Sequence, residues 1–201
     1  MIPEIVKRGR HEIGAMGWSD ENPLAIDNAA EEERLLMKAV EHLTKASGVK
    51  PIGARGPSSI ASLHTHGILE RNGFLYDSTL AAMDEPYEIL LNGRASRLIE
   101  LPISRILDDQ PALSAPRFGP ATLPSPELVF EAFRDDFDAA YREGTMFLLT
   151  LHPHLVGMRS RIGYLDDLIG YIQSKPNVWF ATGGQIASYL KQQAPRADAL
   201  R

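Results

Sequence analysis

Cysteine is absent from this sequence of 201 residues. Its absence excludes disulfide bonds, thiolate nucleophiles and cysteine-ligated zinc together. Long apolar runs are missing too, because no stretch approaches the roughly 18 residues that a membrane-spanning helix needs. The opening residues MIPEIVKRGR also lack the apolar core of a signal peptide. We therefore expect a cytoplasmic protein that does not cross a membrane.

Positive charge is scarce as well. Lys and Arg number 21 against 26 Asp and Glu, which gives a net charge of −5, and the basic residues form no stripe along the chain. A nucleic-acid partner is not expected from such a pattern. The hydrophobic fraction of 44% is ordinary for a globular protein. With no linker or repeat in the chain, the sequence predicts a single domain over residues 1–201.

Segments typical of strands alternate with amphipathic segments along the chain. We expect helices at 2–9, 29–46, 59–73, 126–144, 159–174 and 183–193. We expect strands at 12–18, near 48–57, near 74–80, at 98–104, at 145–155 and at 178–182. Residues 108–126 are Pro-rich and read as a long surface loop. The alternation predicts an α/β fold with parallel strands, either a (β/α) barrel or an open sheet.

Chemistry in such folds lies at the carboxyl ends of strands. His152 ends the apolar run of LTLHP, where an imidazole can act as general acid or base near neutral pH. The alternative is a structural histidine bonded to a loop carbonyl. Arg55, in GARGP, can hold a carboxylate by two hydrogen bonds, or can be a surface arginine on a turn.

Other polar residues have simpler interpretations. Asp77 in YDS can cap or turn the chain. Asp108 and Asp109 can serve as acid and base, but solvated loop charge is the expected role of such a pair. His64 and His66 are two residues apart on an expected helix, so they should point to different faces and form a poor metal pair.

Five ordered motifs resemble the polysaccharide deacetylase family, carbohydrate esterase family four. They are HEIGAMGWSDENP, GVKPIGARGP with GFLYDSTL, IELPIS with LDD, LTLHPHLVGMRSRIGYLDDLI, and VWFATGGQIASYL. The resemblance covers nearly the whole chain. It is greatest to the branch that groups cytoplasmic peptidoglycan-type deacetylases with metal-independent allantoinases.

The resemblance implies a distorted (β/α) barrel that hydrolyses a non-peptide amide, usually an N-acetyl group on a sugar. In the family, one Asp and two His bind a divalent metal such as zinc. By the same resemblance, His152 matches the catalytic acid, Leu151 the wall of the acetyl pocket, and Arg55 the arginine that orients the base. Trp18, Tyr76 and Asp77 are further candidates for contacts with a carbohydrate or small amide substrate.

Departures from the family pattern fall on the metal site. Met16 and Asp20 stand where the family has its two metal-binding histidines. A thioether does not replace an imidazole on such an ion, and Asp20 alone is a weak candidate ligand. The family's Asp-containing first strand has no counterpart in this sequence. We expect a chain that lacks one or two β/α units, binds no metal, and has an open barrel edge where a second copy can pair.

Three functions follow from this pattern. The chain can be a degenerate deacetylase that binds a sugar-like or amide ligand with little or no turnover. It can be a metal-independent amide or ureide hydrolase that uses His152 and Arg55. It can also be a non-catalytic protein whose open edge binds another subunit.

Overall fold

The computed structural model describes residues 2–19, 21–26, 28–114 and 124–193. The chain divides into two compact units. The first comprises residues 1–82, 86–102 and 181–201, and the second comprises residues 83–85 and 103–180. The single domain expected from the sequence stays a prediction.

A four-stranded sheet forms the centre of the described part of the first unit. Its order is β1 (Gly53–Ala54), β2 (Tyr76–Asp77), β4 (Arg94–Glu100), β3 (Tyr87–Leu91). β1, β2 and β4 pair in parallel, whereas β3 is antiparallel to β4. A parallel bridge between Ala15 and Ala54 extends the pairing beyond β1.

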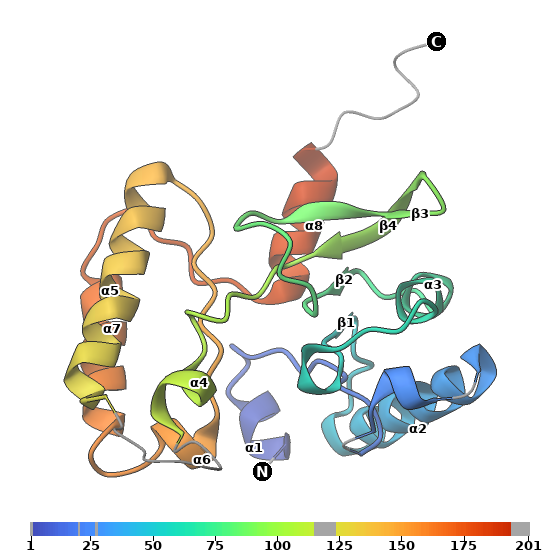
Figure 1. Ribbon diagram of the computed structural model, residues 1–201, viewed down its shortest axis with the longest axis horizontal. Helices are drawn as coiled ribbons and strands as arrows, with labels where there is room; N and C mark the ends of the chain where they lie inside the picture. Colours follow the sequence, from blue (N-terminus) through green and yellow to red (C-terminus); the bar gives the residue numbers. More distant parts are fainter. Residues whose placement is uncertain (1, 20, 27, 115–123, 194–201) are drawn as a thin grey trace. The chain divides into compact units, whose positions relative to one another are not determined.

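Helices lie beside this sheet (Figure 1). The α-helices of the first unit are α1 (Ile2–Lys7), α2 (Ala29–Ser47), α3 (Thr65–Arg71) and α8 (Gly183–Gln193), and the short 3-10 helices are Pro23–Ala25 and Pro57–Ser59. The Asn28 side chain caps α2 by accepting the backbone N–H of Glu31 at 2.9 Å. Gly48, with φ of 76°, ends the helix in the left-handed conformation.

The core of the first unit lies between the sheet and these helices. Its buried members are Ala15, Val40, Ala54, Leu69, Phe74, Ile89 and Leu98. Burial of this apolar surface holds the strands in place, because β1 contributes Ala54, β3 contributes Ile89 and β4 contributes Leu98 to the cluster. Polar residues that follow the strands are thereby held at defined positions.

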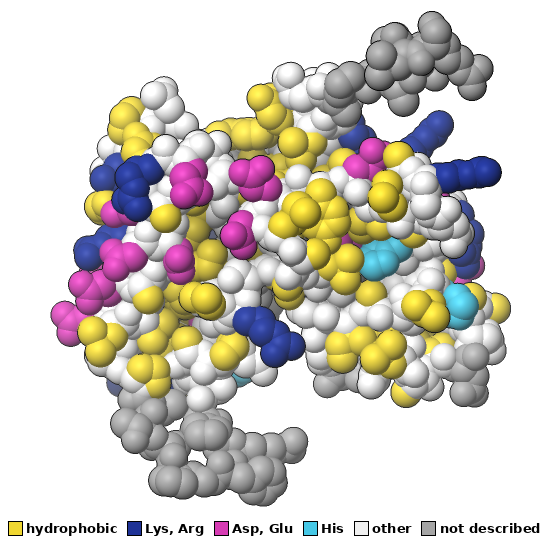
Figure 2. Space-filling view, turned by 45° about the horizontal axis from the view of Figure 1, so that its top comes forward, with side chains coloured by type: hydrophobic (Ala, Val, Ile, Leu, Met, Phe, Trp, Pro, Cys, Tyr) yellow, Lys and Arg dark blue, Asp and Glu magenta, His cyan; other side chains and the backbone are white. Residues whose placement is uncertain are grey.

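The second unit is helical where it is described. It contains α4 (Asp109–Leu113), α5 (Pro126–Glu143), α6 (Pro153–Val156) and α7 (Ile162–Gln173). α5 and α7 lie side by side (Figure 1) and share a core that includes Phe130, Phe133, Phe137, Leu168 and Ile172. Figure 2 shows acidic side chains spread over the surface of this unit.

Several expected elements differ from the structure. Residues 12–18 hold one bridge, at Ala15, rather than a strand. The segment 145–155 likewise has a single bridge, between Thr150 and Asp108, and 178–182 is neither helix nor strand. In these three segments Ala15 and Thr150 alone form bridges, so apolar composition by itself does not make a strand. The helix expected at 59–73 begins only at Thr65.

Two elements were missed. The antiparallel strand β3 pairs with β4 through a tight turn at Asn92 and Gly93, whose φ angles are 52° and 75°. Asn-Gly is the usual sequence signal for such a hairpin. The expected loop 108–126 begins with α4, while residues 115–123 lie outside the described part of the chain. No described helix is long and apolar enough to span a membrane.

Candidate functional site

The loop of residues 11–23 closes on its own acidic side chain. The carboxylate of Glu21 accepts the backbone N–H groups of Trp18 at 2.6 Å and Ser19 at 2.5 Å. Burial opposes ionisation of Glu21, but these hydrogen bonds outweigh it and lower its pKa. Gly17 allows the closure, because its φ is 114° and a Cβ there would lie 2.8 Å from the Glu21 carboxylate.

Met16 of this loop stands where the family resemblance implies a metal-binding imidazole. The Met16 side chain is 55% exposed, and a thioether is a poor ligand for a borderline divalent ion in water. Asp20, the weak candidate ligand, lies outside the described residues. Met16 therefore does not fit the role of an imidazole ligand, and whether the chain binds the family's metal stays a prediction.

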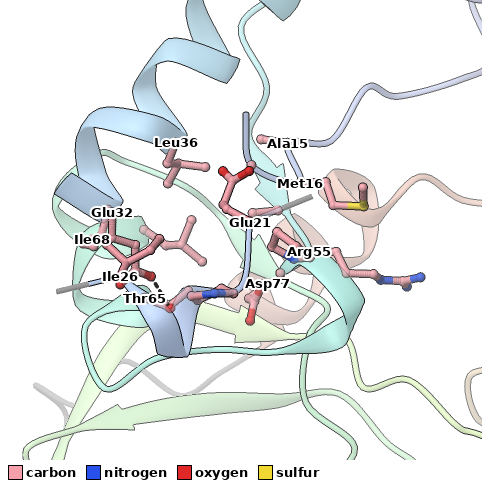
Figure 3. A pocket seen from close by; sticks show the side chains of 16 residues that line it. Ala15, Met16, Glu21, Ile26, Glu32, Leu36, Arg55, Thr65, Ile68 and Asp77 are labelled. Carbon is pink, nitrogen blue, oxygen red and sulfur yellow. Dashed lines mark hydrogen bonds between the residues drawn. The ribbon is translucent and has the colours of Figure 1, made fainter. Parts of the chain in front are cut away.

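A cavity of about 40 Å³ lies behind the loop. Leu36, Ile26 and Ile68 form an apolar side of it, and Glu21 approaches from the loop (Figure 3). The guanidinium of Arg55 points away from that apolar side (Figure 3). Water molecules fit in this cavity.

Arg55 links the ends of two strands. Its Nε donates to the carbonyl oxygen of Ser78 at 2.8 Å, and its Nη2 donates to Ser78 Oγ at 2.8 Å. Ser78 Oγ in turn donates to the carbonyl oxygen of Leu101 at 2.7 Å. The arginine is thus positioned by the sheet and is more than a solvated turn residue.

Tyr76 is enclosed by glycines. A Cβ on Gly53 or Gly183 would lie 1.9 or 2.4 Å from the ring, so only glycine fits at either position. The hydroxyl donates to Glu12 at 2.5 Å, and burial, with Glu12 second, raises the Tyr76 pKa. Glu12 also accepts the backbone N–H of Gly184 at 3.1 Å, which fastens the start of α8.

Trp18 and Asp77 lie in the same unit as Arg55. The ring of Trp18 packs edge-on against His42 at 4.7 Å, with Lys38 Nζ 3.9 Å from its centre. Asp77 is fully buried, and its Oδ2 lies 3.0 Å from His66 Nε2. Substrate contacts by Trp18, Tyr76 and Asp77 stay predictions.

His152 lies in the second unit and is held by Asp109. Its Nδ1 is 2.7 Å from Asp109 Oδ1, and its backbone N–H donates to both carboxylate oxygens, at 2.9 and 3.0 Å. Asp109 is fully buried at the start of α4, where its own N–H donates to the carbonyl oxygen of Thr150. The interpretation of Asp109 as solvated loop charge is therefore wrong.

This contact selects one form of the His152 ring. An ionised carboxylate only accepts hydrogen bonds, so Nδ1 carries the proton and Nε2 is left for chemistry. The His152 side chain is 30% exposed, which leaves the ring accessible. The neighbouring Leu151 packs against the core between α5 and α7, and its role beside an acetyl group stays a prediction.

Two clusters offer atoms that metals bind. In one, Asp108, Asp109 and His152 each place a ligand atom within 4.8 Å of the others. Both oxygens of Asp109 already accept protein hydrogen bonds there, which is typical of a positioning carboxylate. The other cluster is His66, Asp77 and Glu100, also within 4.8 Å. The sequence interpretation rejected His64 and His66 as a metal pair and did not connect His66 with Asp77 or Glu100.

The sequence was compared with family models and with known proteins. No family model matches the sequence. A peptidoglycan deacetylase from Helicobacter pylori is 30% identical over 218 aligned residues, which cover 96% of this chain and 74% of that protein. This chain belongs to the polysaccharide deacetylase family. The resemblance seen in the sequence motifs is thereby confirmed, and so is a deacetylase-like hydrolase.

Solved structures agree with this assignment. A polysaccharide deacetylase from Mycobacterium smegmatis superposes with a TM-score of 0.85 at 35% identity, over 98% of this chain and 68% of that one. PuuE allantoinase gives a TM-score of 0.80 at 27% identity, over 98% of this chain and 64% of that one. The α/β fold of the polysaccharide deacetylase type is confirmed. The missing β/α units and the degenerate metal site stay predictions.

Proposed function

We propose that this chain hydrolyses a non-peptide C–N bond and that His152 transfers the proton. The observation that supports this role is the double contact of Asp109 with the ring and the backbone N–H of His152. Asp109 acts as the positioning residue, since it fixes the ring and its proton. The substrate class is an N-acetylated sugar, as for the peptidoglycan deacetylase relative, or a cyclic ureide, as for the allantoinase relative.

The chemistry needs one water molecule. Nε2 of His152 takes a proton from the water as its oxygen attacks the amide carbonyl carbon. The same Nε2 then gives that proton to the leaving nitrogen as the C–N bond breaks. The products are a carboxylic acid and an amine, so atoms and charge balance. For Arg55 we propose the role that the family resemblance implies, in which the guanidinium binds and orients a carboxylate.

No step in this scheme uses a metal at the 11–23 loop. Met16 offers a thioether where the family has an imidazole, and Glu21 is occupied by the backbone of its own loop. A histidine held by a carboxylate can supply both proton transfers instead. The proposal therefore predicts turnover that a chelator does not abolish.

The test compares the wild-type chain with His152→Ala on two substrates, N-acetylated chito-oligosaccharides and allantoin. Release of acetate or of ring-opened product is measured with and without EDTA. We expect turnover of one of these substrates, and EDTA should not abolish it. The turnover rate should fall at least about 100-fold in His152→Ala. His64→Ala is the control, because His64 is an exposed histidine that lies far from His152 in the sequence.

Two results would contradict the proposal. If His152→Ala turns over substrate as fast as the wild type, His152 does not transfer the proton. If EDTA abolishes turnover and Zn²⁺ restores it, the reaction depends on a metal. In both cases His64→Ala should still behave like the wild type.

Binding without turnover is the second candidate, and Met16 in a metal-ligand position favours it. Chito-oligosaccharide would then shift NMR resonances of the chain while no acetate is released.

Self-association is a third candidate, favoured by the single-residue pairing of β1 with Ala15 at that side of the sheet. Light scattering would report it as a mass twice that of one chain. We also propose a cytoplasmic location, which fractionation of cells would test.

A further inference from the structure

Three side chains that bind metals in other proteins meet at the carboxyl ends of β2 and β4. Asp77 ends β2 and Glu100 ends β4, and the two are register partners in the parallel ladder. Paired residues of neighbouring strands project to the same face of a sheet. His66 reaches them from α3, and one ligand atom of each residue lies within 4.8 Å of the others.

Burial makes this cluster unusual. Asp77 and Glu100 are both fully buried. The oxygens of Asp77 face His66 Nε2 at 3.0 Å and Thr79 Oγ1 at 2.7 Å. Glu100 Oε1 accepts the backbone N–H of Leu80 at 2.8 Å, but Oε2 has no hydrogen-bond partner. A buried carboxylate oxygen without a partner is costly and calls for an explanation.

Charge gives the same indication. Two buried carboxylates on adjacent strands repel each other strongly when both are ionised, because the surroundings screen them poorly. A positive charge between them removes the repulsion and gives Oε2 a partner. We propose that His66, Asp77 and Glu100 bind a divalent cation through Nε2, a carboxylate oxygen of Asp77 and Oε2 of Glu100.

Ligand chemistry points to zinc or a similar transition metal. Mg²⁺ and Ca²⁺ favour all-oxygen sites, whereas an imidazole beside carboxylates suits Zn²⁺. Metal–ligand bonds of roughly 2.0–2.1 Å in a tetrahedral site place ligand atoms about 3.3 Å apart. The 3.0 Å between His66 Nε2 and Asp77 Oδ2 is close to that spacing.

A fourth group and an entry route are also present. Tyr87 lies opposite Glu100 in the β3–β4 ladder, and its hydroxyl is another buried polar atom without a partner among the described residues. It can bind the ion or hydrogen-bond to a water on it. The His66 side chain is 15% exposed, so the ion can enter past the imidazole. The site involves neither the 11–23 loop nor His152 and does not rest on the proposed hydrolysis.

The test is a Zn²⁺ titration of chelator-treated full-length protein by calorimetry. We expect one equivalent to bind, and His66→Gln and Glu100→Gln each to weaken binding at least tenfold. Glu100→Gln keeps the shape and the acceptor for Leu80 N–H, so the fold should survive. His64→Gln is the matched control, because that histidine is exposed and two residues away. It should bind Zn²⁺ like the wild type.

A second measurement uses the unchanged chain. With ¹⁵N-labelled histidine, one equivalent of Zn²⁺ should shift the Nε2 resonance of His66 and leave that of His64 in place. Failure to bind Zn²⁺ would overturn the proposal and leave a shared proton or a buried water as the partner of Oε2. Binding that disappears in His152→Gln but persists in His66→Gln would overturn it too, since the ion would then lie at the other cluster.

Discussion

Asp109 holds His152 by two different groups at once, the ring Nδ1 at 2.7 Å and the backbone N–H at 2.9 Å. The backbone contact fixes where the histidine begins α6, and the ring contact fixes which nitrogen carries the proton. Position and protonation of the ring are therefore set by one buried carboxylate. Under the proposed function, this arrangement would preorganise His152 for proton transfer.

Replacing Asp109 with Ala should cost both fold stability and ring order. The substitution leaves the partly buried N–H of His152 without an acceptor, so the free energy of unfolding should fall by about 1–3 kcal/mol in urea denaturation. Histidine-selective ¹⁵N NMR should also show His152 changing from the Nδ1–H form to a mixture of tautomers. A packing role alone would change the first result and leave the second as in the wild type.

Asp167→Asn is the control for that substitution. Asp167 is exposed on α7 in the same unit, so its loss should change the free energy of unfolding by less than about 0.5 kcal/mol. If Asp109→Ala is no more harmful than Asp167→Asn, the contact with His152 does not matter to stability.

Glu100 should make the metal-free protein less stable as pH rises. Burial, with the charge of Asp77 second, raises the pKa of Glu100 from 4.5 to about 8. Between these values the folded chain holds a proton that the unfolded chain has released. The free energy of unfolding should therefore fall as pH rises from about 5 to 8, by up to about 1.4 kcal/mol per pH unit.

The variant Glu100→Gln isolates this effect. It removes the titrating group, so its unfolding free energy should change little over that pH range, apart from contributions by His66, Asp77 and Tyr87, which face the same site. Saturating Zn²⁺ should reverse the wild-type trend, because the ion competes with protons for the ligands. Urea denaturation at several pH values, with and without Zn²⁺, measures the pH trend and its reversal. If the free energy of unfolding changes with pH in the same way for wild type and Glu100→Gln, the prediction is contradicted.

Local signals in the sequence were enough for the long helices. Asn28 and Gly48 bound α2, and the apolar period of α5 ends at Gly144, as the sequence predicts. Capping side chains and left-handed glycines act within a few residues, so they can be read from the sequence. Strands were harder: 145–155 is as apolar as a strand, yet its apolar side chains pack on α5 and α7.

The sites depend on contacts between distant residues, which explains what the sequence interpretation missed. His152 was predicted as functional from its place after an apolar run, but Asp109, which lies 43 positions earlier, looked like solvated loop charge. His66 and Asp77 are 11 positions apart and meet only because α3 packs beside the sheet. Glu100, the acidic residue within IELPIS, was the available signal for the second cluster.

Gly53 should tolerate no side chain, because a Cβ there would lie 1.9 Å from the Tyr76 ring. Gly53→Ala should lower the free energy of unfolding by about 3 kcal/mol or more through overpacking. Adding Tyr76→Leu should recover part of the loss by clearing the space. Gly67→Ala, on α3, meets only Arg71 Nη1 at 3.9 Å and should stabilise the protein by about 0.5–1 kcal/mol. Equal effects of the two single substitutions in thermal unfolding would contradict the packing around Tyr76.

Tyr76 and Glu12 should be coupled in a double-mutant cycle. The hydroxyl donates to a partly buried carboxylate, and a hydrogen bond to a charged group contributes about 1.5–3 kcal/mol. Tyr76→Phe and Glu12→Gln should each destabilise the first unit, and their combination should cost less than the sum by about that energy. Glu88 is exposed on β3, so the loss of stability in Glu88→Gln should simply add to the loss in Tyr76→Phe.

Because Glu12 also accepts the N–H of Gly184, amide hydrogen exchange at the start of α8 should accelerate in Glu12→Gln more than in Tyr76→Phe. If the two variants are additive, Tyr76 is free to meet a substrate through its hydroxyl, as the family resemblance implies.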